Sequence, residues 1–466
     1  MSLVAGVDSS TQSVKVVVCD ADSGAVVRTG RASHPDGTEV TAAAWLDAYR
    51  KATADPALLK GVAAMAVGGQ QHGMVTLDER GELVREALLW NDNRSAASAV
   101  DLIDDLGGPQ LWADAVGSVP VASFTVAKIR WLARHEPANA ARVHRVILPH
   151  DYLTWEIGGR SFDPVTDRGD ASGTGYFDAT ANSYSDDLVR LAFGRELVLP
   201  RVASPDEVVG ESPEGIMIAP GTGDNMASTL GMVVPDRTAL ISLGTSGVAC
   251  LRSNVQTHDP SGVVAGFADA TGAFLPLVCT LNGARNLVAM AKALSVSLDD
   301  FSALAMTARP GSEGLVFLPY LEGERTPSLP DATGELRGAT LANLTAANLA
   351  RATIEGVLWS LAYGVQVLRE QASPVDAIML TGGAAQSPAV RAIAAAVFGL
   401  PVLATDPYES VAVGAARQAA WALTGSLPDW SAPVSATYQP RPGEQESAVA
   451  LDERYRTASA EVAARA

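Results

Sequence analysis

The chain has 466 residues, of which 47% are hydrophobic and 18% are charged, so it is expected to be a globular protein with a sizeable core. This length is enough for about two to four domains. Its 34 Lys and Arg residues against 52 Asp and Glu residues give a formal net charge of −18, which argues against nucleic acid and anionic membranes as partners. Phosphate ligands remain compatible with this charge, because backbone N–H groups and Mg²⁺ can bind them locally.

The cysteines indicate a reducing compartment. Cys19, Cys250 and Cys279 are too few and too widely spaced for a disulfide framework or a zinc site. The sequence also shows no secretory signal pattern and no run of about 18 apolar residues that would span a membrane. We therefore expect a cytoplasmic protein.

The first predicted element is a hairpin over residues 4–20, in which a polar turn of Ser, Thr and Gln joins two apolar strands. Asp8 lies at the end of the first strand and Lys15 near the start of the second. A carboxylate here could hold a hydrated Mg²⁺, and the lysine could contact a phosphate as a point charge. The alternative is a turn-capping aspartate and a solvated lysine.

A buried strand is predicted at residues 61–67, and it leads into a polar stretch that contains Gln71 and His72. Ligands of α/β proteins often bind beyond the carboxyl ends of strands, where an amide and an imidazole can hydrogen-bond hydroxyl groups. A lone histidine is more often structural. Further on, Trp90 offers an apolar face to the carbon atoms of a polyol and Asp92 a hydrogen-bonding group, although a polar helix start would look the same.

Residues 123–132 are predicted to form an amphipathic helix, and residues 166–175 a long polar loop that lines a binding site. Asp224 then stands between a glycine-rich turn and an apolar helical run, where a carboxylate either caps the helix or faces a binding site as a proton acceptor. A second hairpin follows at residues 239–251, with Gly-Thr-Ser-Gly at its turn. Two hairpins of this kind suggest two similar domains, and two unrelated hairpins are the alternative.

The last third of the chain contains a long apolar helix, predicted at residues 348–368, and a strand at residues 377–381. That strand ends in a turn with Gly382 and Gly383, followed by a helix that starts at Ser387 and Pro388. Glycines beside a helix start suit an adenine or ribose face, although an ordinary turn between a strand and a helix has the same pattern. No P-loop, dinucleotide-binding fingerprint or nucleophile elbow occurs in the sequence.

These motifs, in this order, resemble the FGGY carbohydrate kinases, and within them the xylulose kinases. Residues 123–135 and 334–355 are similar to the two family signatures, and the resemblance runs from the first hairpin to about residue 421. The stretches 70–73 and 323–327 are similar to the versions found in xylulose kinases. In the adenosine loop the sequence departs from the family, with Thr381 where a third glycine is common and Gln386 where a basic residue is frequent.

The resemblance implies an α/β fold with two duplicated actin-like (ribonuclease H-like) ATPase domains around a central cleft. Residues 1–218 would bind the sugar and residues 219–466 would bind ATP. The implied reaction is the ATP-dependent phosphorylation of D-xylulose to D-xylulose 5-phosphate, with Mg²⁺ as the metal. Its partners would be a small-molecule sugar and ATP, and a homodimer is possible.

The resemblance also implies roles for individual residues. Asp224 would be the general base, without needing a raised pKa, and Asp8 would help to place Mg²⁺. The sugar would be held by Gln71, His72, Trp90, Asp92 and Asn225. ATP and its phosphates would be bound by Thr11, Gln12, Lys15, Gly244, Thr245, Asn282, Gly382, Gly383, Ala384 and Gln386.

Two alternatives remain open from the sequence. The substrate could be another ketose or polyol, such as ribulose, gluconate or glycerol, because a few contacts decide between close isomers. The protein could instead be a non-catalytic actin-like ATP switch or filament subunit, which would bind nucleotide without sugar-stimulated turnover.

Overall fold

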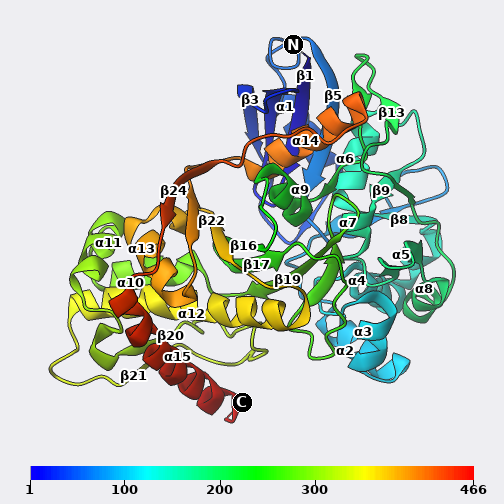
Figure 1. Cartoon of the computed structure of the whole chain (residues 1–466). Helices are drawn as coiled ribbons and strands as arrows, with labels where there is room; N and C mark the ends of the chain where they lie inside the picture. Colours follow the sequence, from blue (N-terminus) through cyan, green and yellow to red (C-terminus); the bar gives the residue numbers. More distant parts are fainter. Residues whose placement is uncertain (1, 466) are drawn as a thin grey trace. The chain divides into compact units, whose positions relative to one another are not determined.

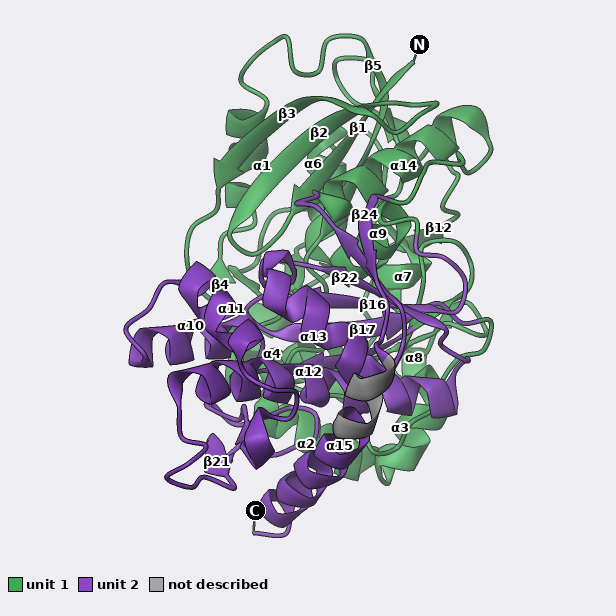
Figure 2. Cartoon of the chain, turned by 60° about the vertical axis from the view of Figure 1, so that its left-hand side comes forward, with its two compact units in different colours: residues 1–233, 254–275, 409–432 green, residues 234–253, 276–408, 433–466 purple. Residues whose placement is uncertain are grey.

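The computed structural model describes residues 2–465, apart from the side chains of residues 442–447. The chain forms two compact units, each assembled from separate stretches of sequence (Figure 2). Unit 1 consists of Met1–Val233, Asn254–Leu275 and Glu409–Ala432. Unit 2 consists of Val234–Ser253, Pro276–Tyr408 and Pro433–Ala466. These units divide the chain differently from the predicted domains 1–218 and 219–466, and the assignment of sugar to the first and ATP to the second stays a prediction.

Unit 1 is built on a mixed sheet with the strand order β13-β14-β5-β1-β2-β3 (Figure 1). Strand β1 runs antiparallel to β2 and parallel to β5. These three strands are buried along nearly their whole length, which explains their continuous apolar sequence. The strands are β1 (Leu3–Ser9), β2 (Ser13–Asp20), β3 (Val26–Ser33), β5 (Val62–Gly69), β13 (Gly210–Glu211) and β14 (Met217–Ile218).

Unit 2 repeats this arrangement in six consecutive strands of a seven-stranded sheet, in the order β19-β17-β16-β22-β23-β24. Strand β16 runs antiparallel to β17 and parallel to β22, as β1 does to β2 and β5. The predicted duplication of the hairpin is therefore confirmed, together with the parallel strand beside it. The strands are β16 (Thr238–Leu243), β17 (Gly247–Leu251), β19 (Phe274–Thr280), β22 (Ala377–Thr381), β23 (Val402–Thr405) and β24 (Val434–Tyr438).

Short strand pairs and helices surround the sheet of unit 1. The pairs are β4 (Glu39–Val40) with β7 (Ala87–Leu88), β6 (Val75–Leu77) with β8 (Arg145–Ile147), β9 (Val165–Asp167) with β12 (Arg201–Ala203), and β10 (Phe177–Asp178) with β11 (Ser183–Tyr184). β18 (Ala265–Ala268) also lies in unit 1, and β15 (Thr222–Gly223) pairs with the end of β5. The helices are α1 (Ala43–Ala52), α2 (Ala96–Leu106), α3 (Pro109–Val116), α4 (Thr125–His135), α5 (Pro137–Arg142), α6 (Pro149–Ile157), α7 (Arg168–Ala171), α8 (Asp186–Phe193), α9 (Asp224–Gly231) and α14 (Ser410–Thr424).

The helices of unit 2 include the two that the sequence predicts. Helix α12 (Ala346–Gln371) begins after Thr345, whose side chain accepts a hydrogen bond from the backbone N–H of Asn348. Helix α13 (Pro388–Phe398) has Ser387 as its N-cap, which confirms the predicted start. The other elements are α10 (Ala284–Ala293), α11 (Leu298–Thr307), α15 (Pro442–Ala463), the pair β20 (Val316–Leu318) and β21 (Glu335–Arg337), and the 3₁₀ turns η1 (Ser312–Gly314) and η2 (Ala384–Gln386).

Two glycines allow helix α14 to pack closely within unit 1. A Cβ atom on Gly6 of β1 would lie 1.8 Å from the carbonyl oxygen of Ala412. A Cβ atom on Gly414 would lie 1.8 Å from the carbonyl oxygen of Ala227 in α9. Only a residue without a side chain permits backbones to approach this closely. Helix α14 therefore packs directly against both β1 and α9.

The prediction of a long polar loop over residues 166–175 is wrong for residues 166–171, which form the end of β9 and the helical turn α7. Residues 172–175 form turns and bends, and the polar side chains of the segment are buried except for the half-buried Arg168. Asp167 caps α7 by accepting hydrogen bonds from the backbone N–H groups of Gly169 and Asp170. Because Asp167, Ser172 and Thr174 hydrogen-bond to the backbone of the segment, it can lie in the interior in spite of its composition.

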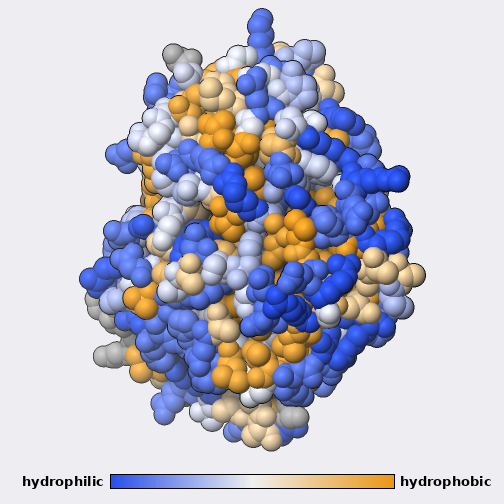
Figure 3. All heavy atoms as spheres, turned by 90° about the vertical axis from the view of Figure 1, so that its right-hand side faces the viewer, coloured by the Kyte–Doolittle hydropathy of each residue, from blue (hydrophilic) through white to orange (hydrophobic). Residues whose placement is uncertain are grey.

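On the face drawn in Figure 3, hydrophilic residues are interspersed with smaller hydrophobic areas. No helix among the residues that the structure describes is long and apolar enough to cross a membrane.

Candidate functional site

Asp224 is the first residue of α9, and strand β15 positions it. β15 pairs with the last residues of β5 and leads through Gly223, the N-cap, into the helix. Asp224 is therefore not the capping residue. Its half-buried carboxylate accepts hydrogen bonds from the next residue, Asn225. Its Oδ1 atom lies 2.8 Å from the backbone nitrogen of Asn225 and 3.1 Å from Nδ2 of the same residue. The capping alternative is therefore excluded, and the role of Asp224 as a proton acceptor stays a prediction.

The environment of Asp224 increases its affinity for a proton. Burial raises the pKa of this carboxyl to about 7, and the nearby carboxylates Asp170 and Asp8 contribute to the increase. The predicted role of Asp224 did not require a raised pKa. A carboxylate with a pKa near neutrality accepts a proton more readily than an ordinary aspartate does.

Gln71 and Asn225, both predicted to bind sugar, contact each other beside Asp224. Asn225 donates from Nδ2 to Oε1 of Gln71 over 2.8 Å. Gln71 is buried just beyond the end of β5, whereas Asn225 is half-buried at the start of α9. The structure thus brings two predicted sugar ligands together with the predicted base.

His72 is held in a strained and well-defined position. Its φ angle is 66°, in the left-handed region that residues other than glycine rarely adopt. Its Nδ1 atom lies 2.7 Å from the carbonyl oxygen of Gly173, which it contacts as a donor. The ring stacks on Phe124 with 4.9 Å between centroids. Because a strained conformation persists only where its surroundings enforce it, the orientation of the imidazole is fixed before any ligand binds.

A hydrogen bond connects Trp90, a predicted sugar ligand, with Thr11, a predicted phosphate ligand. The indole Nε1 of Trp90 donates to Oγ1 of Thr11 over 2.9 Å, and 36% of the tryptophan surface is exposed. An exposed indole face next to a hydroxyl suits a polyol, which has both carbon and oxygen atoms to contact. Gln12, the next residue of the same turn, is exposed.

Asp92 is already engaged by protein groups. Its carboxylate accepts from Oγ1 of Thr38 and from Nε of Arg94, each over 2.8 Å. Burial alone would raise the pKa of Asp92, but these hydrogen bonds lower it below its ordinary value. Asp92 is thus ionised and held in place, so a sugar hydroxyl would share it with Arg94.

Asp8 and Lys15 lie across the first hairpin from each other. Oδ2 of Asp8 is 3.7 Å from Nζ of Lys15, and Lys15 also pairs with the more exposed Glu409 over 2.6 Å. Burial raises the pKa of Asp8 to about 6, although Lys15 opposes the shift. An exposed ion pair contributes little stability, so Lys15 can exchange Glu409 for a phosphate at small cost.

The buried carboxylate of Asp8 fits a hydrated magnesium ion. Its Oδ1 atom is buried and lacks a hydrogen-bond partner, as expected of an oxygen that serves a ligand. Within the described part of the chain, no cluster of three or more His, Cys, Asp or Glu side chains could hold a metal. Mg²⁺ usually keeps several waters and uses one or two carboxylates with substrate phosphates, so a single aspartate is sufficient.

In unit 2, the turn between β16 and β17 is fixed against the start of α10. The carbonyl oxygen of Gly244 accepts from the backbone N–H of Ala284 over 2.8 Å, and that of Thr245 accepts from Gly283 over 3.1 Å. Gly244 is half-buried, and Thr245 is exposed. An exposed small hydroxyl on a rigid turn is suited to contact a phosphate.

The turn after β22 presents a bare backbone surface. Gly382 has a φ angle of 97°, and a Cβ atom there would lie 2.6 Å from the carbonyl oxygen of Leu243, so only glycine fits. A Cβ atom on Gly383 would meet nothing within 4 Å. Ala384 then opens the 3₁₀ turn η2. A flat ring could lie against this open backbone, as the resemblance implies for adenosine.

Asn282 and Gln386, two predicted nucleotide ligands, are bound to the protein itself. Nδ2 of Asn282 lies 3.0 Å from Oε2 of Glu324, and the whole side chain is buried. Gln386 donates to the carbonyl oxygen of Thr405 over 3.2 Å and accepts from Arg391 over 2.7 Å. Each side chain therefore stabilises a loop, and a nucleotide would have to share these hydrogen bonds.

The sequence reasoning missed a buried ionic cluster in unit 1 that consists of His150, Asp151, Asp167 and Asp170. Nδ1 of His150 is 2.7 Å from Oδ2 of Asp170, and Nε2 is 3.1 Å from Oδ1 of Asp151. Burial alone would lower the pKa of His150, but the neighbouring carboxyl groups raise it to about 9. The only sequence signal is the pair of short acidic stretches at residues 150–151 and 167–170, which have no motif spacing.

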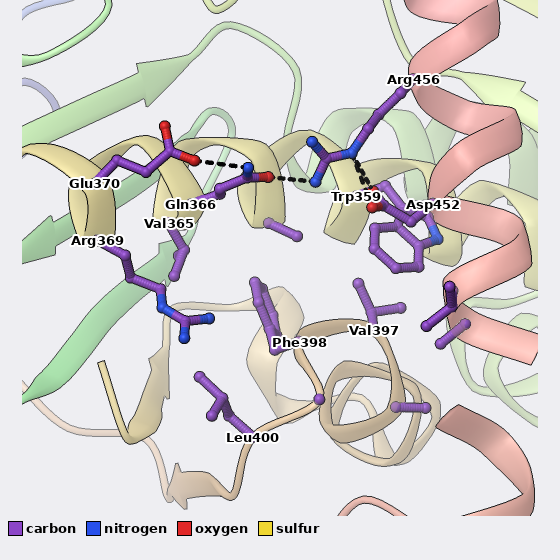
Figure 4. Close-up of a pocket in the computed structure, with 15 residues that line it drawn as sticks. Trp359, Val365, Gln366, Arg369, Glu370, Val397, Phe398, Leu400, Asp452 and Arg456 are labelled. Carbon is purple, nitrogen blue, oxygen red and sulfur yellow. Dashed lines mark hydrogen bonds and ion pairs between the residues drawn. The ribbon is translucent and has the colours of Figure 1, made fainter. Parts of the chain in front are cut away.

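Unit 2 contains a cavity of about 650 Å³. Helices α12, α13 and α15 border it (Figure 4). None of the predicted site residues, all of which the structure describes, lines it. Its lining combines apolar side chains with a salt bridge, and it includes Val365, Val397, Phe398, Leu400, Asp452 and Arg456. The cavity is therefore separate from the residues predicted to bind sugar and ATP.

Comparisons with known proteins cover almost the whole chain. The N-terminal domain profile of the FGGY family of carbohydrate kinases matches residues 3–231, and its C-terminal domain profile matches residues 239–423. The chain is 43% identical to the xylulose kinase of Streptomyces coelicolor over 437 residues, which cover 91% of this chain and 88% of that protein. It is 42% identical to the xylulose kinase of Streptomyces rubiginosus over 468 residues, which cover 97% and 94%. Among solved structures, xylulose kinase from Bifidobacterium adolescentis aligns with a TM-score of 0.88 and 41% identity, over 96% of this chain and 99% of that one.

Proposed function

Because the chain belongs to the FGGY family of carbohydrate kinases, we propose that it transfers the terminal phosphoryl group of ATP to D-xylulose, giving ADP and D-xylulose 5-phosphate. The identity of 42–43% to xylulose kinases over most of the chain supports this sugar among the ketoses and polyols. The sugar-binding role then falls to unit 1 and the ATP-binding role to unit 2.

The observation that carries the proposal is the position of Asp224. The carboxylate lies at the start of α9, beside Gln71 and Asn225, with a pKa of about 7. We propose that it orients the attacking hydroxyl of the sugar and accepts its proton during transfer. Phosphoryl transfer needs little more from a protein than such a group, in-line positioning and charge neutralisation.

The other groups near Asp224 would orient the sugar. The amides of Gln71 and Asn225 and the fixed imidazole of His72 offer hydrogen bonds to hydroxyl groups, and Trp90 offers an apolar face. Asp92, held by Arg94, would accept from one further hydroxyl. Several fixed contacts of this kind would hold the bound sugar with its hydroxyl positioned for attack on the phosphate.

ATP would be held mainly by unit 2. Gly382, Gly383 and Ala384 would lie along the adenosine, with Asn282 and Gln386 beside them, while Gly244 and Thr245 would contact phosphates. Transfer then requires the terminal phosphate to reach the hydroxyl beside Asp224. In unit 1, Thr11, Gln12 and Lys15 would contact that phosphate. Bound Mg²⁺, placed with the help of Asp8, supplies neutralising charge to the phosphate oxygens.

The proposal is tested by measuring ADP release with D-xylulose, D-ribulose, gluconate and glycerol as acceptors. We expect D-xylulose to give the highest kcat/KM. A clear preference for another acceptor would replace the sugar and keep the enzyme class. Nucleotide binding without turnover of any sugar would instead favour an actin-like ATP switch.

A further inference from the structure

The buried cluster around His150 contains none of the groups that contact the sugar or ATP in the proposed reaction. It contains one imidazole and the three carboxyl groups of Asp151, Asp167 and Asp170, all in the interior of unit 1. Burying unpaired charge is costly, and an apolar core of the same volume is often at least as stable. Burial raises the pKa of all three carboxyl groups, that of Asp151 to about 7. A buried cluster of four titratable groups is therefore weak evidence for a purely stabilising role, and the function of the cluster depends on the residues that it contacts.

The first connection leads from His150 to a sugar ligand. His150 binds Oδ2 of Asp170 over 2.7 Å. Oδ1 of Asp170 and Nε2 of Gln71 are both buried without a hydrogen-bond partner. Burial raises the pKa of Asp170, and His150 and the Gln71 amide oppose the shift. Gln71 in turn accepts from Asn225, which also binds Asp224. Polar side chains thus lead from His150 through Asp170 and Gln71 towards the proposed base.

The second connection leads from His150 to the backbone that carries the base. Nε2 of His150 is 3.8 Å from Oδ1 of Asp167. Oδ2 of Asp167 accepts from Oγ1 of Thr222 over 2.7 Å. Thr222 lies in β15, two residues before Asp224, so this contact fixes the strand that leads into α9. His150 and the base are therefore linked through the main chain as well as through side chains.

The imidazole is also packed tightly against both strands that end at the site. A Cβ atom on Gly69, the last residue of β5, would lie 2.8 Å from Cβ of His150. A Cβ atom on Gly221, just before β15, would lie 2.9 Å from Cδ2 of the ring. Since the ring fills the space beside these two strands, its position and theirs depend on each other.

We propose that the buried His150 is a positioning residue for the reaction of the proposed function, acting on the base Asp224 through Asp170 and Asp167. Without the imidazole, these two buried carboxyl groups lose their common partner. The positions of Gln71 and Thr222 are then held less firmly. The base loses its fixed position, although its own side chain is unchanged.

The test compares His150→Gln with the matched control His144→Gln, six residues earlier at the edge of β8 and only partly buried. We expect His150→Gln to lower kcat by about 10-fold to 100-fold, since small displacements of a catalytic group have effects of this size. The KM for ATP should stay within about twofold, because the cluster lies in unit 1. Hydrogen exchange at residues 222–226 should become faster. The control His144→Gln should leave both kcat and this exchange rate unchanged.

A second pair of variants covers the possibility that His150→Gln does not fold. Asp170→Asn interrupts the link to Gln71, and Thr222→Val interrupts the link from Asp167 to β15. We expect the first to raise the KM for the sugar by about tenfold and the second to lower kcat by about threefold to tenfold. His150→Lys, which supplies a positive charge, should retain more activity than His150→Gln.

The outcomes separate this inference from the proposed function. If the wild-type protein phosphorylates no sugar, the proposed function fails, but hydrogen exchange in His150→Gln still tests the positioning role without turnover. If His150→Gln only lowers Tm and leaves kcat and exchange at residues 222–226 unchanged, the inference is overturned. Wild-type kinetics in both Asp170→Asn and Thr222→Val would overturn it as well.

Discussion

Asp224 owes its chemical character to the residues around it. Burial and the carboxylates of Asp170 and Asp8 raise its pKa to about 7, while Asn225 fixes one of its oxygens. A weakly basic aspartate would hold the sugar hydroxyl but take its proton only late in the reaction. The raised pKa makes proton acceptance easier at neutral pH without a histidine at this position.

We predict that Asp224→Ala lowers kcat by on the order of 10²-fold to 10⁴-fold, because the base is lost while the sugar contacts remain. Steady-state kinetics and calorimetric titration with D-xylulose measure the two effects separately. The exposed Asp163, replaced by alanine, serves as the matched control. Wild-type turnover in Asp224→Ala would rule out this residue as the base.

The pH dependence follows from the same carboxylate. Only ionised Asp224 can accept a proton, and its pKa is about 7 in the free protein. We therefore expect kcat/KM for the sugar to be highest above pH 7 and to fall by about tenfold per pH unit well below it. A profile measured from pH 5.5 to 8.5 that stays flat would mean that Asp224 does not titrate in this range or does not act as the base.

For single residues, the sequence predicted which side chains lie at the site better than it predicted the contacts between them. Asp224, Gln71 and Asn225 were predicted together, and the structure places them in contact. The His150 cluster was not predicted, because its members are brought together by the packing of α6, β9 and α7 rather than by spacing along the chain. Contacts between side chains distant in sequence leave no local pattern.

At the scale of elements, the position of α9 depends on α14. The two helices approach so closely that Gly414 has no room for a methyl group beside the carbonyl oxygen of Ala227. Because α9 begins with Asp224, any shift of this helix moves the base as well. The catalytic geometry is thus supported by a helix that comes from the last quarter of the sequence.

We predict that Gly414→Ala lowers the free energy of unfolding by about 1–3 kcal/mol or more, since the added methyl group overpacks a contact between backbones. The Tm measured by thermal unfolding and the kcat of the folded protein should both decrease. Thr424→Ala, at the exposed end of the same helix, is the control and should change both by little. Unchanged stability of Gly414→Ala would show that α9 and α14 can separate without cost.

Elements with a strong local pattern were predicted well. Helix α12 was expected at residues 348–368 and spans Ala346–Gln371, and Ser387 caps α13 as expected. The segment 166–175 was read as a loop because it is rich in Asp, Ser, Thr and Gly. Burial of such a segment depends on capping and on distant partners, which composition does not reveal.

At the scale of the whole molecule, the predicted fold class of two duplicated actin-like α/β domains is confirmed by the repeated strand order and by the match to a solved xylulose kinase structure. The division of the chain could not be read from the sequence. Residues 254–275 and 409–432 return to unit 1, and these returns depend on contacts between distant segments. A homodimer stays a prediction that light scattering can test.

Ligand binding should change the arrangement of the two units. If unit 1 binds the sugar and unit 2 binds ATP, transfer requires the two ligands to meet, and excluding water would limit wasteful hydrolysis of ATP. We therefore expect a smaller radius of gyration in X-ray scattering with D-xylulose and a non-hydrolysable ATP analogue together than with either ligand alone. An unchanged radius would argue against closure.

Helix α14 also has a consequence for biosynthesis. The helix that packs against β1 and α9 is supplied by residues 410–424, so the unit that starts at the amino end is finished late in translation. Until the ribosome has added residues 410–424, the surface of β1 around Gly6 remains exposed. A fragment that stops before residue 409 lacks this cover, and we expect it to depend on chaperones or to aggregate.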